Sequence, residues 1–215
     1  MRGSGAGLRR AKIIFLFFVT IGVFRSNLNR NAKRLTDLPV PELSDEKIML
    51  RVREGQLSEL TELFERYHVP LFNFFLRLTL DKALSEDLTQ NLFYRILRYR
   101  QSFEPASGSF RSWVYRMARN VHADHFRQEQ KVPGGVDGGL DRVADADVPY
   151  SEEQFERLDA AMAKLAPDQR EILVLSRYQG LKYDEISKIK DISVPAIKVQ
   201  VYRALRQLRH LYFKQ

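Results

Sequence analysis

The chain of 215 residues contains no cysteine, so it can form neither a disulfide framework nor a thiolate metal site. It also lacks a convincing membrane span, because the apolar stretch at residues 13–24 would reach about 18 Å as a helix, against the roughly 30 Å of a bilayer core. Gly-rich phosphate loops, His/Glu metal spacings and Ser or Cys nucleophile motifs are missing as well. We therefore expect a protein of a reducing compartment that is not an enzyme and binds no cofactor.

Acidic residues are absent from the first 34 positions, which hold eight Lys and Arg. The formal net charge of +8 comes from this segment alone, since the remainder has 27 basic and 27 acidic residues. The overall charge therefore says nothing about DNA, and only its distribution along the body is informative. Three interpretations of residues 1–43 stay open: translation from a start that is not the natural one, which we favour, then a weak membrane tether, then an extension that packs on the protein.

Helical periodicity dominates from Ser44 onward, without the alternation expected of strands. We expect a helix from the cap Ser44 to the stop Gly55, and then a long helix over residues 57–80. Further helices are expected at about 85–100 and 110–130. Together these segments predict one helical domain over residues 44–130.

Residues 131–150 are rich in Gly, Asp and Pro, and this composition is typical of a flexible linker. A Ser151/Gln154 capping box opens the next helix, and Pro167 stands in the first turn of another that ends at Gly180. The fold class predicted is all-α, with two small helical domains, residues 44–130 and 151–215, joined by the linker. Residues 1–43 are left outside this fold.

The stretch "YDEISKIKDISVPAIKVQVYRALRQLR", residues 183–209, has the spacing of a helix-turn-helix, and its second helix contains no acidic residue. Ser193 is a suitable N-cap for that helix, and Asp191 in the turn tolerates a left-handed backbone. One face is apolar, and the opposite face carries Lys198, Val199, Tyr202, Arg203, Arg206 and Arg209. This pattern fits a helix that enters the major groove of DNA, but it also fits a basic face in solvent.

The stretch "GSFRSWVYRMARNVHADHFRQ", residues 108–128, mixes aromatic residues with arginines. Periodicity predicts one buried face (Phe110, Trp113, Val114, Met117, Val121) and one outward face (Tyr115, Arg116, Arg119, His122, Phe126, Arg127). Exposed rings beside guanidinium groups favour single-stranded nucleic acid, because bases stack on the rings while cations hold the backbone. Tyr115 and Phe126 could instead serve a contact between helices, and His122 and His125 are interpreted as surface or strand-contacting residues rather than metal ligands.

The stretch "SEDLTQNLFYRILRYR", residues 85–100, has Leu88, Leu92, Ile96 and Tyr99 on one face. Its other face mixes an acid, an amide, an aromatic ring and an aliphatic side chain, at Asp87, Gln90, Tyr94 and Leu97. Such a mixture is typical of a protein–protein contact. Burial of this face against the linker or the second domain is the alternative.

Taken in order, "EDLTQNLFYRIL", "SGSFRSWVYRMARNVHADHFR" and "LAPDQREILVLSRYQGLKYDEISKIKDISVPAIKVQVYRALRQLR" resemble the extracytoplasmic-function sigma factors, the bacterial sigma-70 type that keeps only regions 2 and 4. The resemblance covers residues 44–213. It implies region 2 in residues 44–130, region 4 in residues 151–215, and a transcription initiation factor in the cytoplasm.

The resemblance implies contacts for each region. Region 2.2 docks on the β′ clamp helices of core RNA polymerase, here through Asp87, Gln90, Phe93, Tyr94 and Leu97. Regions 2.3 and 2.4 open the −10 element and hold an extruded base, here through Ser107, Gly108, Ser109, Phe110, Trp113, Tyr115, Arg116, Arg119, Asn120 and Arg127. Region 4.2 reads the −35 duplex, here through Ser193, Pro195, Ala196, Lys198, Val199, Tyr202, Arg203 and Arg206.

The resemblance further implies a contact with the polymerase β flap and a possible anti-sigma partner. Association with a membrane is expected only through the N-terminal segment or through such a partner. This chain departs from the family at Asn91, where an acid is usual, at Asp191, where glycine is common, and at Gln200, where many members have Arg. These changes leave the promoter sequence open. The rival hypothesis is a helix-turn-helix regulator that binds duplex DNA without core polymerase, and an adaptor that binds only protein is a weaker one.

Overall fold

The computed structural model describes residues 43–129 and 152–214, and helix α2 (Asp45–Arg53) is the first element in that range. The side chain of Ser44 accepts a hydrogen bond from the backbone N–H of Lys47 at 3.4 Å, as its N-cap position predicts. Gly55 follows the helix with φ at 103°, a conformation that favours glycine. Ile48, Met49 and Val52 form the buried face of α2.

A short 3₁₀ turn, η1 (Leu57–Glu59), leads into α3 (Leu60–Thr79), the long helix that the sequence predicts. Helix α4 (Lys82–Arg98) begins three residues before the predicted start at Ser85. The reason is that Asp81 caps it, with a carboxylate oxygen 2.9 Å from the N–H of Leu84. The hydroxyl of Ser85 is buried and donates to the carbonyl of Asp81 at 2.5 Å.

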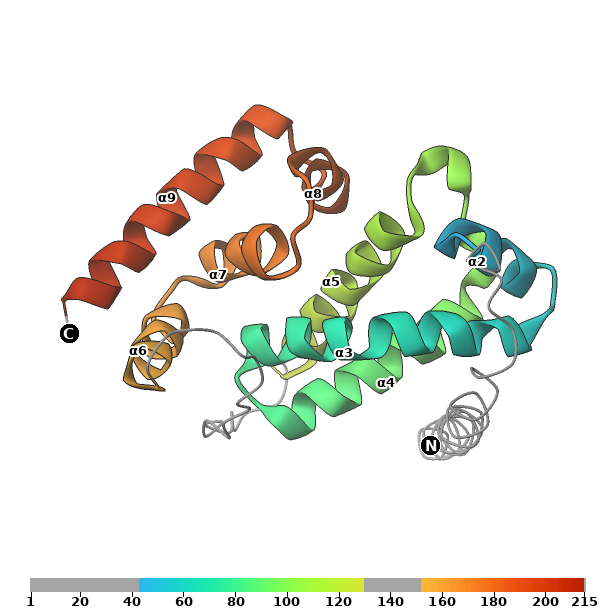
Figure 1. Ribbon diagram of the computed structural model, residues 1–215, viewed down its shortest axis with the longest axis horizontal. Coiled ribbons are helices and arrows are strands. Elements are labelled where there is room, and N and C mark those ends of the chain that lie inside the picture. Colours follow the sequence, from blue (N-terminus) through green and yellow to red (C-terminus); the bar gives the residue numbers. More distant parts are fainter. Residues whose placement is uncertain (1–42, 130–151, 215) are drawn as a thin grey trace, which may run out of the picture. The chain divides into compact units, whose positions relative to one another are not determined.

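Two 3₁₀ turns, η2 (Arg100–Ser102) and η3 (Pro105–Ser107), connect α4 to α5 (Phe110–Glu129). The second run of helices comprises α6 (Glu152–Ala163), α7 (Pro167–Leu173), α8 (Tyr183–Lys190) and α9 (Val194–Phe213) (Figure 1). Between α7 and α8 lies a π-helical turn, η4 (Val174–Tyr178), which the sequence did not predict. Gly180 ends this stretch with φ at 61°.

Contacts divide the described residues into two compact units, residues 43–69 with 87–121, and residues 70–86 with 122–129 and 152–214. In the described part of the first unit, large side chains from α2, α3, α4 and α5 share a core that includes Met49, Leu63, Leu92, Ile96, Phe110 and Val114. In the second unit, α7, α8 and α9 bury Ile172, Leu173, Ile186, Ile189, Ile197 and Val201. Burial of such apolar side chains is the main contribution that stabilises each unit.

Residues 43–129 and 152–214 contain helices and turns but no strand, in agreement with the all-α prediction. No helix among them combines the length and the apolar character that a membrane crossing requires. The N-terminal segment, the linker at residues 131–150 and Ser151 of the predicted capping box lie outside the described residues.

Candidate protein-binding and nucleic-acid-binding surfaces

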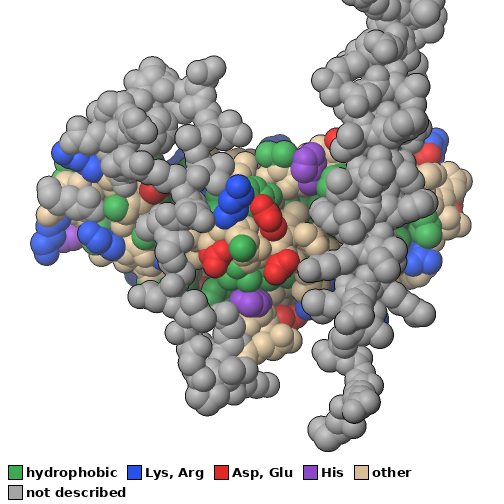
Figure 2. Space-filling model, turned by 90° about the horizontal axis from the view of Figure 1, so that it is seen from below, with side chains coloured by type: hydrophobic (Ala, Val, Ile, Leu, Met, Phe, Trp, Pro, Cys, Tyr) green, Lys and Arg blue, Asp and Glu red, His purple; other side chains and the backbone are tan. Residues whose placement is uncertain are grey.

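The outward face of α4 has the mixed character that the sequence predicts. Asp87 and Tyr94 are exposed, and Gln90 and Leu97 are partly exposed. The hydroxyl of Tyr94 accepts a hydrogen bond from Arg98 at 3.2 Å, which fixes the ring on this face. Figure 2 shows one side of the molecule, on which acidic side chains border hydrophobic ones. We call Asp87, Gln90, Tyr94 and Leu97 the α4 face.

Phe93 does not lie on the exposed α4 face, although the sequence placed it among the polymerase-binding residues, and its contact with polymerase stays a prediction. Its side chain is 7% exposed. The ring packs against Phe64 of α3, with 4.8 Å between the centroids. Position 93 directly follows the core residue Leu92, so the helix turns it only about 100° away from the core, and α3 covers it.

The segment between α4 and α5 forms a small aromatic cluster. Phe103 and Phe110 are buried at its two ends, with ring centroids 6.0 Å apart and a T-shaped arrangement. Trp113, on the first turn of α5, contacts both rings at 5.5 Å and 5.9 Å and remains partly exposed. The backbone between the phenylalanines therefore forms a short loop, residues 104–109, held at each end by a buried ring.

Within this loop, Ser107 is exposed, and Gly108 and Ser109 are partly exposed. Gly108 has φ at 151° and ψ at 178°, a combination that side chains disfavour. The side chain of Ser109 accepts a hydrogen bond from the N–H of Ser112 at 3.2 Å and so caps α5. Phe110 is fully buried and its ring anchors the loop, so its contact with DNA stays a prediction.

Along α5, the outward residues beyond the loop are only partly those expected. Arg116, Asn120 and Arg127 are exposed, and Arg119 is partly exposed. Tyr115 was expected to face outward, but it is 1% exposed and belongs to the core. Burial raises the pKa of its hydroxyl, and a buried ring offers no surface on which a base could stack. As with Phe93, the residue follows a core position, here Val114, and the buried face is wider than periodicity suggests.

Near the end of α5, Phe126 is exposed and lies 4.7 Å from the ring of His122. His122 was interpreted as a surface or strand-contacting residue, but it is only partly exposed. Burial lowers its pKa to about 4, so the imidazole is neutral at physiological pH and adds no positive charge to a DNA surface. No group of three or more His, Cys, Asp or Glu side chains arranged for a metal occurs in residues 43–129 and 152–214.

The helix-turn-helix prediction is confirmed as local structure. Asp191 adopts the left-handed conformation, with φ at 55° and ψ at 45°, and ends α8. Ser193 caps α9, accepting a hydrogen bond from the N–H of Ala196 at 3.4 Å. Because Ser193 has this structural task, its side chain has less freedom to contact DNA than the sequence suggests.

The outward face of α9 is basic and carries apolar rings and methyl groups. Tyr202 is 68% exposed and Val199 is 47% exposed. The other exposed members of this face are Lys198, Arg203 and Arg206, with Pro195 exposed and Ala196 partly exposed at the start of the helix. Ile197, Val201 and Ala204 are buried on the opposite side. The amphipathic division is therefore confirmed for the first half of α9, whereas Leu205, expected on the apolar face, is 36% exposed. We call Lys198, Val199, Tyr202, Arg203 and Arg206 the α9 face.

Sequence reasoning missed the contacts that α2 makes with the loop at residues 104–109. Glu46 accepts a hydrogen bond from the backbone N–H of Phe110 at 3.0 Å. Arg53 donates to the carbonyl of Phe103 at 2.9 Å. The seven-residue spacing of Glu46 and Arg53 places them on one side of α2, but no sequence signal says which loop they meet.

Comparisons with known proteins agree with this geometry. Residues 63–132 match the family model described as Sigma-70 region 2, and residues 155–208 match Sigma-70, region 4. The chain is 30% identical over 165 residues to RNA polymerase sigma factor CarQ of Myxococcus xanthus, covering 76% of this chain and 94% of CarQ. It is also 30% identical over 154 residues to ECF RNA polymerase sigma factor SigM of Bacillus subtilis (strain 168), covering 70% of this chain and 93% of SigM.

Solved structures share the fold. The sigma factor RpoE in complex with the anti-sigma factor NepR from Bartonella quintana matches with a TM-score of 0.60 and 23% identity, over 71% of this chain and 96% of that one. CnrH in complex with the cytosolic domain of CnrY matches with a TM-score of 0.62 and 20% identity, over 80% of this chain and 98% of that one.

Proposed function

The chain belongs to the extracytoplasmic-function group of the sigma-70 family, and from its exposed surfaces we propose how it acts as a transcription initiation factor. The α4 face binds core RNA polymerase, the loop at residues 104–109 with the outward side of α5 opens the −10 element, and the α9 face reads the −35 duplex. The protein works in the cytoplasm, where its polymerase is found.

The observation that carries the proposal is the loop held between two buried phenylalanines. Its exposed backbone and the partly exposed Trp113 offer a place for an unstacked base. Arg116 and Asn120 lie one and two turns further along α5, where they can hold the backbone of the separated strand. A regulator that binds only duplex DNA does not need a loop that receives an unstacked base. The presence of both sigma regions also favours the initiation factor over that regulator.

For polymerase binding, the α4 face supplies a carboxylate, an amide and two apolar groups within about three turns of helix. Such a combination suits a moderately polar interface, in which Tyr94 and Leu97 exclude water around charge-assisted hydrogen bonds of Asp87. Phe93 supports this face from beneath by packing on Phe64.

The α9 face combines three cations with Val199 and Tyr202. Cations hold the phosphates of both strands, and an exposed valine can contact a thymine methyl group in the major groove. The absence of acidic residues from α9 leaves nothing on that helix to repel phosphate. The solved relative RpoE is described as a complex with the anti-sigma factor NepR, and we extend the proposal to a partner of that class.

The test is co-purification of the full chain with bacterial core RNA polymerase, comparing the wild type with the Asp87→Ala/Gln90→Ala double variant. Glu65→Ala, an exposed acid on α3, is the matched control. We expect stoichiometric binding by the wild type and the control, and loss of binding by the double variant with its helical circular dichroism unchanged. Binding of promoter duplex without any binding of polymerase by the wild type would instead support the regulator.

A further inference from the structure

Helix α2 contacts the loop at residues 104–109 from both ends. At the entry to the loop, Arg53 donates to the carbonyl of Phe103 and lies 3.6 Å from the carboxylate of Glu104. Gln101 strengthens this end by donating to the carbonyl of Arg53 at 2.7 Å. At the exit, the carboxylate of Glu46 receives the N–H of Phe110 at 3.0 Å.

The hydrogen bond between Glu46 and the N–H of Phe110 satisfies a backbone group at the start of α5. Phe110 is the first residue of α5, so its N–H has no partner within the helix, and its side chain is fully buried. The side chain of Ser109 accepts the hydrogen bond of the Ser112 N–H, and the carboxylate of Glu46 accepts that of the Phe110 N–H. A carboxylate is also favoured at this position because the N-terminus of a helix carries partial positive charge.

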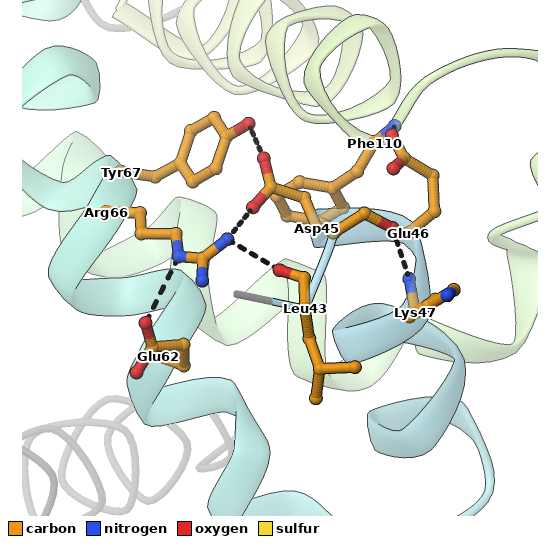
Figure 3. Close-up of polar contacts among 9 residues, drawn as sticks. Leu43, Asp45, Glu46, Lys47, Glu62, Arg66, Tyr67 and Phe110 are labelled. Atoms are coloured by element: carbon orange, nitrogen blue, oxygen red, sulfur yellow. Dashed lines mark hydrogen bonds and ion pairs between the residues drawn. The ribbon is translucent and has the colours of Figure 1, made fainter. Parts of the chain in front are cut away.

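Helix α2 is itself fixed to the first unit. Figure 3 shows Asp45 between Arg66 and Tyr67 of α3, with Glu46 directed toward the backbone of Phe110. Asp45 accepts from Arg66 at 2.7 Å and from Tyr67 at 2.5 Å, and Arg66 also donates to the carbonyl of Leu43. The ring of Tyr67 in turn meets Phe110 edge-on at 5.1 Å. These contacts make α2 a fixed support rather than a loose terminal helix.

We propose that Glu46 and Arg53 are positioning residues for promoter opening: they hold the loop at residues 104–109 in the conformation that receives an unstacked base, and they do not contact DNA themselves. This inference rests on the proposed function of the loop. Glu46 is the more informative of the two, because its charge would repel the phosphate backbone if it lay in the DNA path.

The first arm of the test measures hydrogen–deuterium exchange of the full chain, comparing the wild type, Glu46→Ala, Glu46→Gln and the control Glu54→Ala. Glu54 is an exposed acid at the C-terminal end of α2. Glu46→Ala should speed exchange of the Phe110 amide and its neighbours about tenfold, and leave the centres of α3 and α4 unchanged. Glu46→Gln keeps an acceptor oxygen and should retain most of the protection. Unchanged exchange at the loop in Glu46→Ala would overturn the inference.

The second arm uses holoenzyme assembled with core polymerase and a single-stranded −10 oligonucleotide, taken from a promoter that the wild type selects from a randomised library. Glu46→Ala should lower affinity for this strand about tenfold, with core binding and −35 duplex binding unchanged. Equal losses on the strand and on the −35 duplex would overturn a positioning role, and tighter strand binding by Glu46→Gln would mean that Glu46 faces DNA. If the wild type shows no preference for its selected strand, the proposed function fails, and the role of α2 in promoter opening fails with it.

Discussion

The ammonium group of Lys190 at the end of α8 contacts the carboxylate of Glu171 on α7, where the two side chains are only 6% and 12% exposed. The pair therefore joins α7, which precedes the helix-turn-helix, to α8, which is its first helix. Asp168 lies 3.9 Å from the same ammonium group, but its side chain is 93% exposed and contributes little. A nearly buried pair of this kind fixes the relative position of two short helices.

Removing one member of this pair should destabilise the second unit strongly, because the remaining charge stays nearly buried and loses its short contact with the opposite charge. We expect Lys190→Met or Glu171→Leu alone to lower the free energy of unfolding by about 3 kcal/mol, and the double variant to lose less than either. Asp168→Asn should change it by less than about 0.5 kcal/mol. Trp113 is the only tryptophan and lies in the first unit, so its fluorescence reports the unfolding of that unit. A urea midpoint that changes in circular dichroism but not in fluorescence therefore identifies the unfolding of the second unit. Additive losses in the double variant would contradict the coupling.

The left-handed backbone at Asp191 predicts opposite effects for two substitutions. Asp191→Gly should raise the stability of the second unit by about 0.5 kcal/mol, because glycine adopts this conformation without steric cost. Asp191→Val should lower it by about 1–2 kcal/mol, because a β-branched side chain is strained there. Thermal unfolding followed by circular dichroism measures both. Similar midpoints for the two variants would show that the turn relaxes to another conformation.

Arg203 on the α9 face should contribute one phosphate contact to −35 recognition. We expect Arg203→Ala in the holoenzyme to weaken duplex binding and to reduce the slope of log affinity against log salt by about 0.9. Lys164→Ala removes an exposed cation outside α9 and should leave the slope unchanged. Fluorescence anisotropy at several salt concentrations measures the slope. Equal slopes for Arg203→Ala and the wild type would place this arginine away from the DNA.

The pKa of His122, lowered by burial to about 4, makes stability depend on pH in a definite direction. The unfolded chain binds this proton near pH 6.5 while the folded chain does not, so stability falls as the pH drops from about 6.5 toward 4. We expect His122→Phe to remove about 2 kcal/mol of that loss between pH 7 and 4.5. Urea midpoints at the two pH values measure it, with the exposed His210→Phe as control. An identical pH dependence in His122→Phe and the wild type would contradict the assignment.

Local signals in the sequence predicted the local features well. The caps at Ser44 and Ser193 and the turn at Asp191 depend on neighbouring backbone groups alone, so residue type and position are enough to find them. The start of α4 was missed because Asp81 and Ser85 are both acceptable caps, and only the buried position of Ser85 decides between them.

Surfaces were harder to predict than elements. Periodicity locates the centre of a buried face but not its width, and Phe93 and Tyr115 both lie at the edge of such a face. Whether an edge residue is covered depends on a neighbouring helix, as Phe64 covers Phe93. The contact of Glu46 with Phe110 joins residues 64 positions apart, so no spacing rule reaches it.

The family match for region 2 begins at residue 63, after α2 has ended at Arg53. A hybrid factor assembled by exchanging that matched segment would therefore receive every loop residue that we propose to face the base, without the helix that contacts both ends of the loop. Such a graft would bind promoters poorly although its DNA-facing side chains were transferred intact. The segment to transplant should therefore include α2 and Leu43, whose carbonyl accepts a hydrogen bond from Arg66.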